Sequence, residues 1–224
     1  MTAEPSQVVD PERALAIAYA PAARRTALAK LFQLDERLGQ IVATTSEPMI
    51  GLMRLTWWRE ALEKLDQPGR KVPDEPLLRA LAEEIVPRFA SGAMLAAIED
   101  GWSALIDEDD PERLLLRHGG ERGRHLFAAA AAILGADDAR LPAAGEVWAL
   151  TDLGFHHSSA TLSAAARTRA VQLADAIPSG RWPSAARPLA ALFTLAVGDS
   201  RKGRRVQGGP ARLMRMLALR MTGR

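Results

Sequence analysis

The chain has 224 residues, of which 48% are hydrophobic, so it is long enough to form one domain with a substantial core. It contains no cysteine, which excludes disulfides, thiolate metal sites and thiol catalysis. No apolar run approaches the ~20 residues that span a bilayer, and the first residues lack the basic and apolar segments of a secretory signal. We therefore expect a cytoplasmic protein.

The net charge of +2 is unevenly distributed along the chain. Residues 1–153 carry 25 acidic and 17 basic side chains, whereas residues 154–224 carry 2 acidic and 12 basic ones. A cationic C-terminal third indicates either an anionic partner or a basic face that balances the acidic first part of the same molecule.

Helix-forming residues dominate, and β-branched residues never alternate in a strand pattern, so the sequence predicts an all-α protein. Proline and glycine mark the predicted boundaries. In chain order, we expect a short helix between Pro11 and Pro21, then helices at about 22–42, 48–66, 76–86, 91–106, 111–117, 121–134, 143–176, 184–197 and 210–221. The linker at 67–76 is too short to separate domains. We expect a single domain over residues 1–224, ending in a basic loop and helix at 200–224.

The helix that begins near Pro48 carries two adjacent tryptophans between two arginines. Four apolar residues share one stripe at helical spacing: Leu55, Trp58, Leu62 and Leu65. Trp57 lies about 100° away, beside Arg54, so this helix should contact partners on two sides. In one interpretation both indoles belong to the core. In the other, Arg54 or Arg59 faces a central cavity, and these arginines with Trp57 and Trp58 bind a diphosphate or a carboxylate.

Three segments resemble the squalene/phytoene synthase family, and they occur in the family's order. They are ALAKLFQLDERLGQIVATTSEPMIGLMRLTWWREAL (27–62), GEVWALTDLGFHHSSA (145–160) and RWPSAARPLAALFTLA (181–196). The resemblance implies an isoprenoid-synthase-type helical bundle around a central cavity. In active members, two aspartate-rich helices face each other there and hold the Mg²⁺ that binds prenyl diphosphates. Mg²⁺ requires oxygen ligands at about 2.1 Å in octahedral geometry.

Both aspartate-rich motifs are altered in this sequence. Gly39 and Gln40 stand where the resemblance places the first aspartate pair, while Asp35 and Glu36 fall on the preceding positions of the motif. In the second motif Asp152 remains, but Phe155 and His156 replace the family's arginine and aspartate. The Gly-Gln replacement and the Arg-Leu-x-Trp-Trp helix resemble a branch of the family that contains a mitochondrial assembly factor for respiratory complex I.

Three functional hypotheses follow. The first is a non-catalytic protein without a cofactor, which binds a lipid-like ligand or a partner and serves the assembly of a membrane complex. The second is an active, Mg²⁺-dependent prenyltransferase, in which Asp35, Glu36 and Asp152 form a reduced metal site and Arg54 and Arg59 lie near a prenyl diphosphate. The third is an adaptor that is peripheral on the inner membrane. Losing both ligand pairs removes the largest electrostatic contribution to diphosphate ionisation, so we favour the first.

Other polar clusters have simpler interpretations. The acidic run before Pro111 predicts a solvated loop in which Asp110 caps the next helix. The glycines at 119–123 match no nucleotide-binding fingerprint and predict a break between helices. His156 and His157 are adjacent on a predicted helix and cannot chelate one metal together, so we expect no metal site.

The last predicted helix is basic and amphipathic, with Leu213, Met214, Leu217 and Met221 set against Arg212, Arg215 and Arg220. It is either the closing helix of the bundle or a helix that lies on an anionic membrane. No recognition motif accompanies the charge, so we expect no nucleic acid partner.

Overall fold

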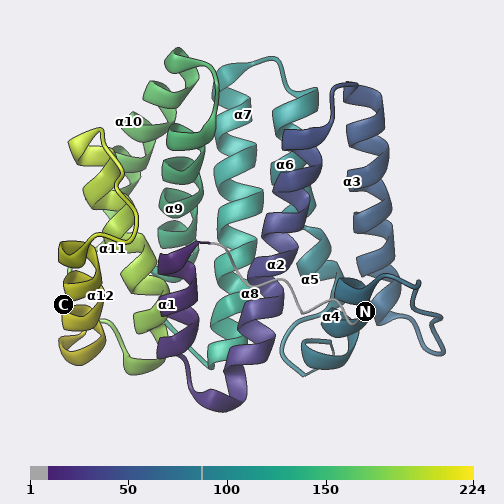
Figure 1. Ribbon diagram of the computed structural model, residues 1–224, viewed down its shortest axis with the longest axis horizontal. Helices are drawn as coiled ribbons and strands as arrows, with labels where there is room; N and C mark the ends of the chain where they lie inside the picture. Colours follow the sequence, from purple (N-terminus) through teal and green to yellow (C-terminus); the bar gives the residue numbers. More distant parts are fainter. Residues whose placement is uncertain (1–9, 87) are drawn as a thin grey trace.

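The computed structural model describes residues 10–86 and 88–224, and all regular structure in these residues is helical. The predicted all-α fold is confirmed. Figure 1 shows most helices side by side, from α3 at one edge to α11 and α12 at the other. The α-helices are α1 (Pro11–Tyr19), α2 (Ala22–Thr44), α3 (Pro48–Glu63), α4 (Pro76–Glu84), α5 (Gly92–Ala96), α6 (Ile98–Asp107), α7 (Pro111–Arg117), α8 (His125–Leu134), α9 (Leu141–His156), α10 (Ala160–Ala176), α11 (Arg187–Lys202) and α12 (Pro210–Thr222).

Proline and short polar side chains begin many of these helices. Proline occupies one of the first two positions of α1, α3, α4, α7, α9, α11 and α12, where its missing N–H costs no intrahelical hydrogen bond. The Asp110 carboxylate accepts hydrogen bonds from the backbone N–H groups of Glu112 and Arg113 at the start of α7. The predicted N-cap at Asp110 is therefore confirmed.

Two predicted boundaries are wrong. The helix expected at 143–176 is two helices, because the chain leaves the helix at His157 and the Ser159 hydroxyl caps α10 by accepting from the N–H of Leu162. The break expected at residues 119–123 is a π-helical segment, η2 (His118–Arg124), that joins α7 to α8 without interruption. A π-helical turn shifts the register of the side chains that follow it, and such turns are frequent at functional sites.

Small residues allow η2 to approach its neighbours closely. A Cβ atom on Gly145 of α9 would lie 2.2 Å from the carbonyl oxygen of Gly123, and one on Gly101 of α6 would lie 2.4 Å from the backbone nitrogen of Arg122. Any side chain at Gly101 or Gly145 would therefore force the helices apart. This close contact of η2 with α6 and α9 places the side chain of Arg122 in the interior, where it is 1% exposed.

Large apolar side chains remain exposed at the two edges of the bundle. Those on α3 are Met49, Ile50, Met53 and Trp57, and those on α12 are Leu213, Met214, Leu217 and Met221. Met216 and Leu219 of the same α12 are buried against the bundle, so this helix closes the fold and also keeps an exposed apolar face. In the described residues, no helix combines the length and the hydropathy that crossing a membrane requires.

Candidate functional site

Two carboxylates that are far apart in the sequence meet at the centre of the bundle. Asp35 lies in α2 and Asp152 lies in α9; they are 0% and 7% exposed. The guanidinium of Arg122, from η2, lies between them. Its Nη2 donates to Asp35 Oδ2 at 2.9 Å and to Asp152 Oδ2 at 2.8 Å, and its Nε donates to Asp35 Oδ1 at 2.8 Å. One buried arginine therefore bridges the two acidic helices.

Aromatic rings and a histidine complete the surroundings of Arg122. Its guanidinium carbon lies 4.0 Å from the ring centroid of Trp102 and 4.9 Å from that of Trp148, within cation–π distance of both. Its Nη1 lies 3.1 Å from His118 Nε2. Arginine can only donate, so this histidine nitrogen accepts, and the Nδ1–H donates to the carbonyl of Gly101 at 2.7 Å. The side chain of Arg122 is held on all its polar edges.

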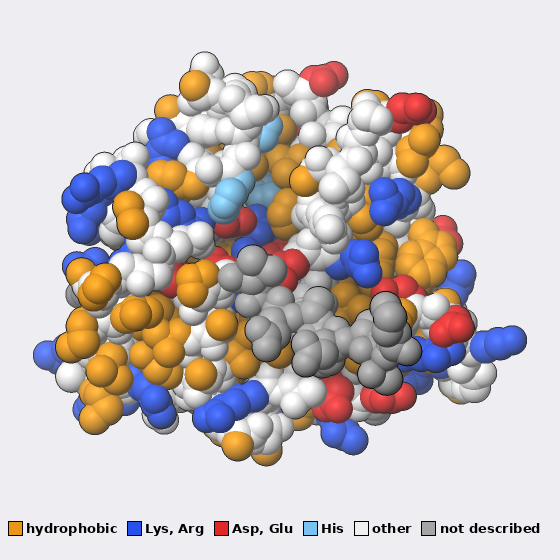
Figure 2. All heavy atoms as spheres, viewed as in Figure 1, with side chains coloured by type: hydrophobic (Ala, Val, Ile, Leu, Met, Phe, Trp, Pro, Cys, Tyr) orange, Lys and Arg blue, Asp and Glu red, His pale blue; other side chains and the backbone are white. Residues whose placement is uncertain are grey.

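Further arginines surround the bridge. Arg13 of α1 reaches Asp35 at 3.3 Å and Asp152 at 3.8 Å, and it also stacks near Trp148. Arg205, from the loop between α11 and α12, donates to Asp152 Oδ1 at 3.1 Å. Part of the predicted basic loop is therefore tied to the interior. Figure 2 shows histidine, acidic and basic side chains together near the middle of the viewed face.

A second layer ties the C-terminal helix to this network. Arg212 of α12 forms ion pairs with both Glu12 and Asp199, with Nη2 to oxygen distances of 2.7 Å and 2.9 Å. A void of about 10 Å³ lies beside these residues, at the lower limit of the space that one water needs. Arg212 thus neutralises one acidic group near the start of the chain, Glu12, and one in α11, Asp199.

The charges of the central groups depend on each other. Burial alone would raise the pKa of Asp35 and of Asp152, but Arg122 and the neighbouring cations hold both pKa values below the usual range. Burial lowers the pKa of His118 to about 3, and the adjacent Arg122 adds to this effect. At neutral pH, the centre therefore contains two ionised aspartates, an ionised arginine and a neutral histidine.

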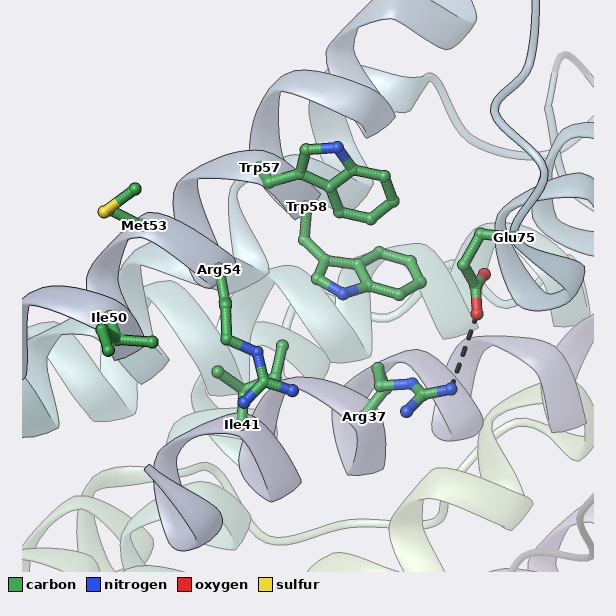
Figure 3. A pocket seen from close by; sticks show the side chains of 8 residues that line it. All are labelled: Arg37, Ile41, Ile50, Met53, Arg54, Trp57, Trp58 and Glu75. Carbon is green, nitrogen blue, oxygen red and sulfur yellow. Dashed lines mark ion pairs between the residues drawn. The ribbon is translucent and has the colours of Figure 1, made fainter. Parts of the chain in front are cut away.

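A groove of about 480 Å³ lies between α2 and α3, on another side of α2 from Asp35. Its lining is Arg37 and Ile41 of α2, Ile50, Met53, Arg54, Trp57 and Trp58 of α3, and Glu75. Figure 3 shows the side chain of Arg54 extending toward Ile41 and Arg37, with the two indoles next to each other. Residues 37 and 41 are about 200° and 240° around the helix from residue 35, so the groove and the central network use different faces of α2.

The comparisons with known proteins give one match, to the first part of the chain. The family model for squalene/phytoene synthase matches residues 7–88, a little over a third of the chain. No curated protein and no solved structure matches the chain. The matched stretch includes Asp35 and the tryptophan helix but ends before Arg122 and Asp152.

The Mg²⁺ that the family implies does not fit between these aspartates. All four carboxylate oxygens of Asp35 and Asp152 already interact with cationic side chains. A divalent cation about 4 Å from the guanidinium of Arg122 would be repelled by about 8 kcal/mol at an effective dielectric constant of 20. No group of three or more acidic or histidine side chains in the described part of the chain could hold a metal ion.

The altered motif positions are also occupied by other groups. A Cβ on Gly39 would lie 2.6 Å from the indole of Trp102, so an aspartate at this position would collide with that ring. The Trp102 indole Nε1 donates to Asp35 at 3.0 Å. In the second motif, His156 Nδ1 lies 3.2 Å from Asp152 Oδ1, and hydrogen bonding to this carboxylate raises the pKa of His156.

The structure brings together only some of the residues that the sequence singled out. Asp35 and Asp152 meet, and Glu36 lies at the rim, 3.6 Å from Arg13. Arg54, Trp57 and Trp58 line the separate groove, while Arg59 pairs with Glu99 at 3.7 Å.

The interpretation that both indoles belong to the core is wrong. Trp58 is 4% exposed, but Trp57 is 43% exposed, because the helix turns this side chain toward solvent. The alternative in which Arg54 or Arg59 faces the centre is also wrong, since neither contributes to the central network. The cationic residues that do contribute, Arg13, Arg122 and Arg205, were not singled out by the sequence.

Proposed function

We propose that this protein is a non-catalytic member of the squalene/phytoene synthase family that acts by binding. The observation that carries the proposal is the Arg122 bridge between Asp35 and Asp152. A fixed guanidinium stands where the resemblance expects metal-bound carboxylates to face each other. The buried cation stabilises the two helices and leaves their carboxylates no free oxygen for a metal.

The proposal has a chemical basis in the ionisation of a prenyl diphosphate. Breaking the carbon–oxygen bond of such a substrate develops negative charge on the leaving group, and metal cations supply much of its stabilisation. Arg122 cannot replace them, because three of its N–H donors are directed at protein carboxylates and a fourth at His118. Four of the five N–H donors of Arg122 therefore already have protein partners and are not available to a diphosphate.

The binding role has two supports on the surface. The α2–α3 groove combines apolar walls with arginines, and the exposed face of α12 combines apolar and basic side chains. We propose that the protein binds a lipid-like ligand or a partner, and that its cationic end attaches it peripherally to an anionic membrane. Assembly or maintenance of a membrane complex is the role that the resemblance to the assembly-factor branch implies.

The proposal is tested by a diphosphate-release assay with farnesyl and geranylgeranyl diphosphate, with and without Mg²⁺. We expect no release above a protein-free control, and the same result for Asp35→Asn and Asp152→Asn. Mg²⁺-dependent release that disappears in either variant would establish the prenyltransferase hypothesis instead. Folding of each variant is checked by circular dichroism, so that loss of activity is separated from loss of structure.

A further inference from the structure

The groove between α2 and α3 contains a cation without a partner. In the described part of the chain, Arg54 forms no hydrogen bond or ion pair, although its side chain is directed into the groove. Arg37 forms one ion pair, in which its Nη2 lies 3.5 Å from Glu75 Oε1, and no other hydrogen bond or ion pair within the described residues. Figure 3 shows the Arg54 guanidinium beside Ile41 and the Arg37 guanidinium directed toward Glu75. Both arginines line the same groove, and arginine donors are suited to a carboxylate or a phosphate.

Apart from Glu75, which pairs with Arg37, the remaining walls of the groove are apolar. They are formed by Ile41, Ile50, Met53, Trp57 and Trp58. Its volume of about 480 Å³ falls within the range of small-molecule sites, in which a mostly apolar lining carries a few polar groups that orient the ligand. Methionine is common at binding surfaces that accept varied partners, and tryptophan is enriched among the residues that contribute most to binding.

We propose that this groove binds a single-chain anionic amphiphile, with its head group between Arg54 and Arg37 and its chain along Ile50, Met53 and Trp57. The inference rests on the proposed binding role and names the class of ligand. A monomeric ligand is favoured over a flat anionic bilayer because exposed acidic side chains are close in sequence to the groove residues. Glu47 precedes α3, Glu60 and Glu63 lie in its last turn, and Asp74 precedes Glu75. A bilayer surface would approach these carboxylates, whereas a single head group inside the groove would contact the arginines.

The ligand class is tested by isothermal titration of decyl phosphate below its critical micelle concentration, compared with hexyl phosphate and inorganic phosphate. We expect one site for decyl phosphate and no measurable binding of inorganic phosphate. Each methylene that the groove covers fully should strengthen binding about fourfold, so decyl phosphate should bind at least about tenfold more tightly than hexyl phosphate. Equal binding of inorganic and decyl phosphate would overturn the proposal.

Matched variants of the same helix locate the site. Arg54→Gln should weaken decyl phosphate binding about tenfold or more, because it removes a charge-assisted hydrogen bond, whereas Lys64→Gln should not change it. Ile50→Ser should weaken binding, whereas Met49→Ser, an exposed position outside the groove, should not. Decyl phosphate binding that is equally strong in Arg54→Gln and in the unmodified protein would contradict the assignment.

Two further outcomes would also overturn the inference. One is binding to vesicles that contain phosphatidylglycerol without any binding of monomeric decyl phosphate. The other is self-association, measured by sedimentation, that is lost in Trp57→Ala, since a second copy of the chain would then cover the groove. None of these results affects the diphosphate-release assay, so failure of this inference is distinguishable from failure of the proposed function.

Discussion

Replacing Arg122 by methionine tests the central network most severely. The substitution retains much of the aliphatic volume but removes three hydrogen bonds to Asp35 and Asp152 and one to His118. Removing one partner of a buried ion pair costs about 3–5 kcal/mol, because the remaining charges are left uncompensated. We expect Arg122→Met to lower the free energy of unfolding by about 4 kcal/mol, and the melting temperature by about 10 °C for a chain of this size.

The assay is urea and thermal unfolding followed by circular dichroism, with Arg117→Met as the matched control. Arg117 lies five residues earlier in the same helical run and forms ion pairs of 2.8 Å with Asp100 and Asp107, but its side chain is 29% exposed. Ion pairs this accessible contribute about 0–1 kcal/mol. Equal losses of unfolding free energy for Arg122→Met and Arg117→Met would contradict this expectation, because they would show that burial of the ion pairs does not increase their contribution to stability.

A second substitution separates loss of charge balance from loss of packing. Asp35→Asn alone should destabilise the protein, because it leaves the buried Arg122 with less negative charge. In the Arg122→Met background, the same change should recover part of the lost stability, because it removes an unpaired buried carboxylate. If the two losses simply add, the network is not the coupled unit that its geometry indicates.

Three further predictions address pH, packing and membrane contact. The pKa of His118 is lowered to about 3, below its unfolded value of about 6.5. The free energy of unfolding should therefore fall as the pH decreases from 6.5, by up to about 1.4 kcal/mol per pH unit. Urea unfolding of His118→Gln at several pH values should show a smaller dependence of this free energy on pH. Gly39→Ala should cost about 1–3 kcal/mol by overpacking, whereas Gly120→Ala, where a Cβ meets nothing within 4 Å, should be neutral or stabilising in urea unfolding. The double variant Lys202→Gln/Arg204→Gln should bind phosphatidylglycerol vesicles roughly 30-fold more weakly at low salt, because each lost charge removes about 1 kcal/mol of binding free energy. Unchanged cosedimentation with the vesicles would argue against a membrane-bound cationic end.

The helices and the core stripe could be predicted because their signals are local. The 3.6-residue period identified Leu55, Trp58 and Leu62 as a buried stripe, and proline marked where helices begin. The same period could not predict whether Trp57 is buried, because a second apolar face is buried only if another helix covers it. In this fold α3 lies at the edge of the bundle, and no helix of residues 10–86 and 88–224 buries the Trp57 side chain (Figure 1).

The central site could be predicted only in part. Asp35 and Asp152 were candidates because the family resemblance directs attention to them. Arg122 was missed because it lies 87 residues from Asp35 and 30 residues from Asp152, and no local sequence pattern shows such a pairing. The π-helical geometry of residues 118–124 also moves Arg122 to a face that an α-helical period does not predict. The signal that could have found it is the set of glycines around it, because Gly119 and Gly123 have no side chain that would keep the neighbouring helix α9 at a distance.

Isothermal titration of farnesyl diphosphate into the purified protein, with and without Mg²⁺, tests most directly whether the Arg122 bridge excludes a metal. We expect that Mg²⁺ neither creates nor strengthens binding, because Arg122 already neutralises the two aspartates that would hold the metal. Binding that requires Mg²⁺ and is followed by diphosphate release would contradict this expectation, and would show that the carboxylates exchange their internal cation for a metal.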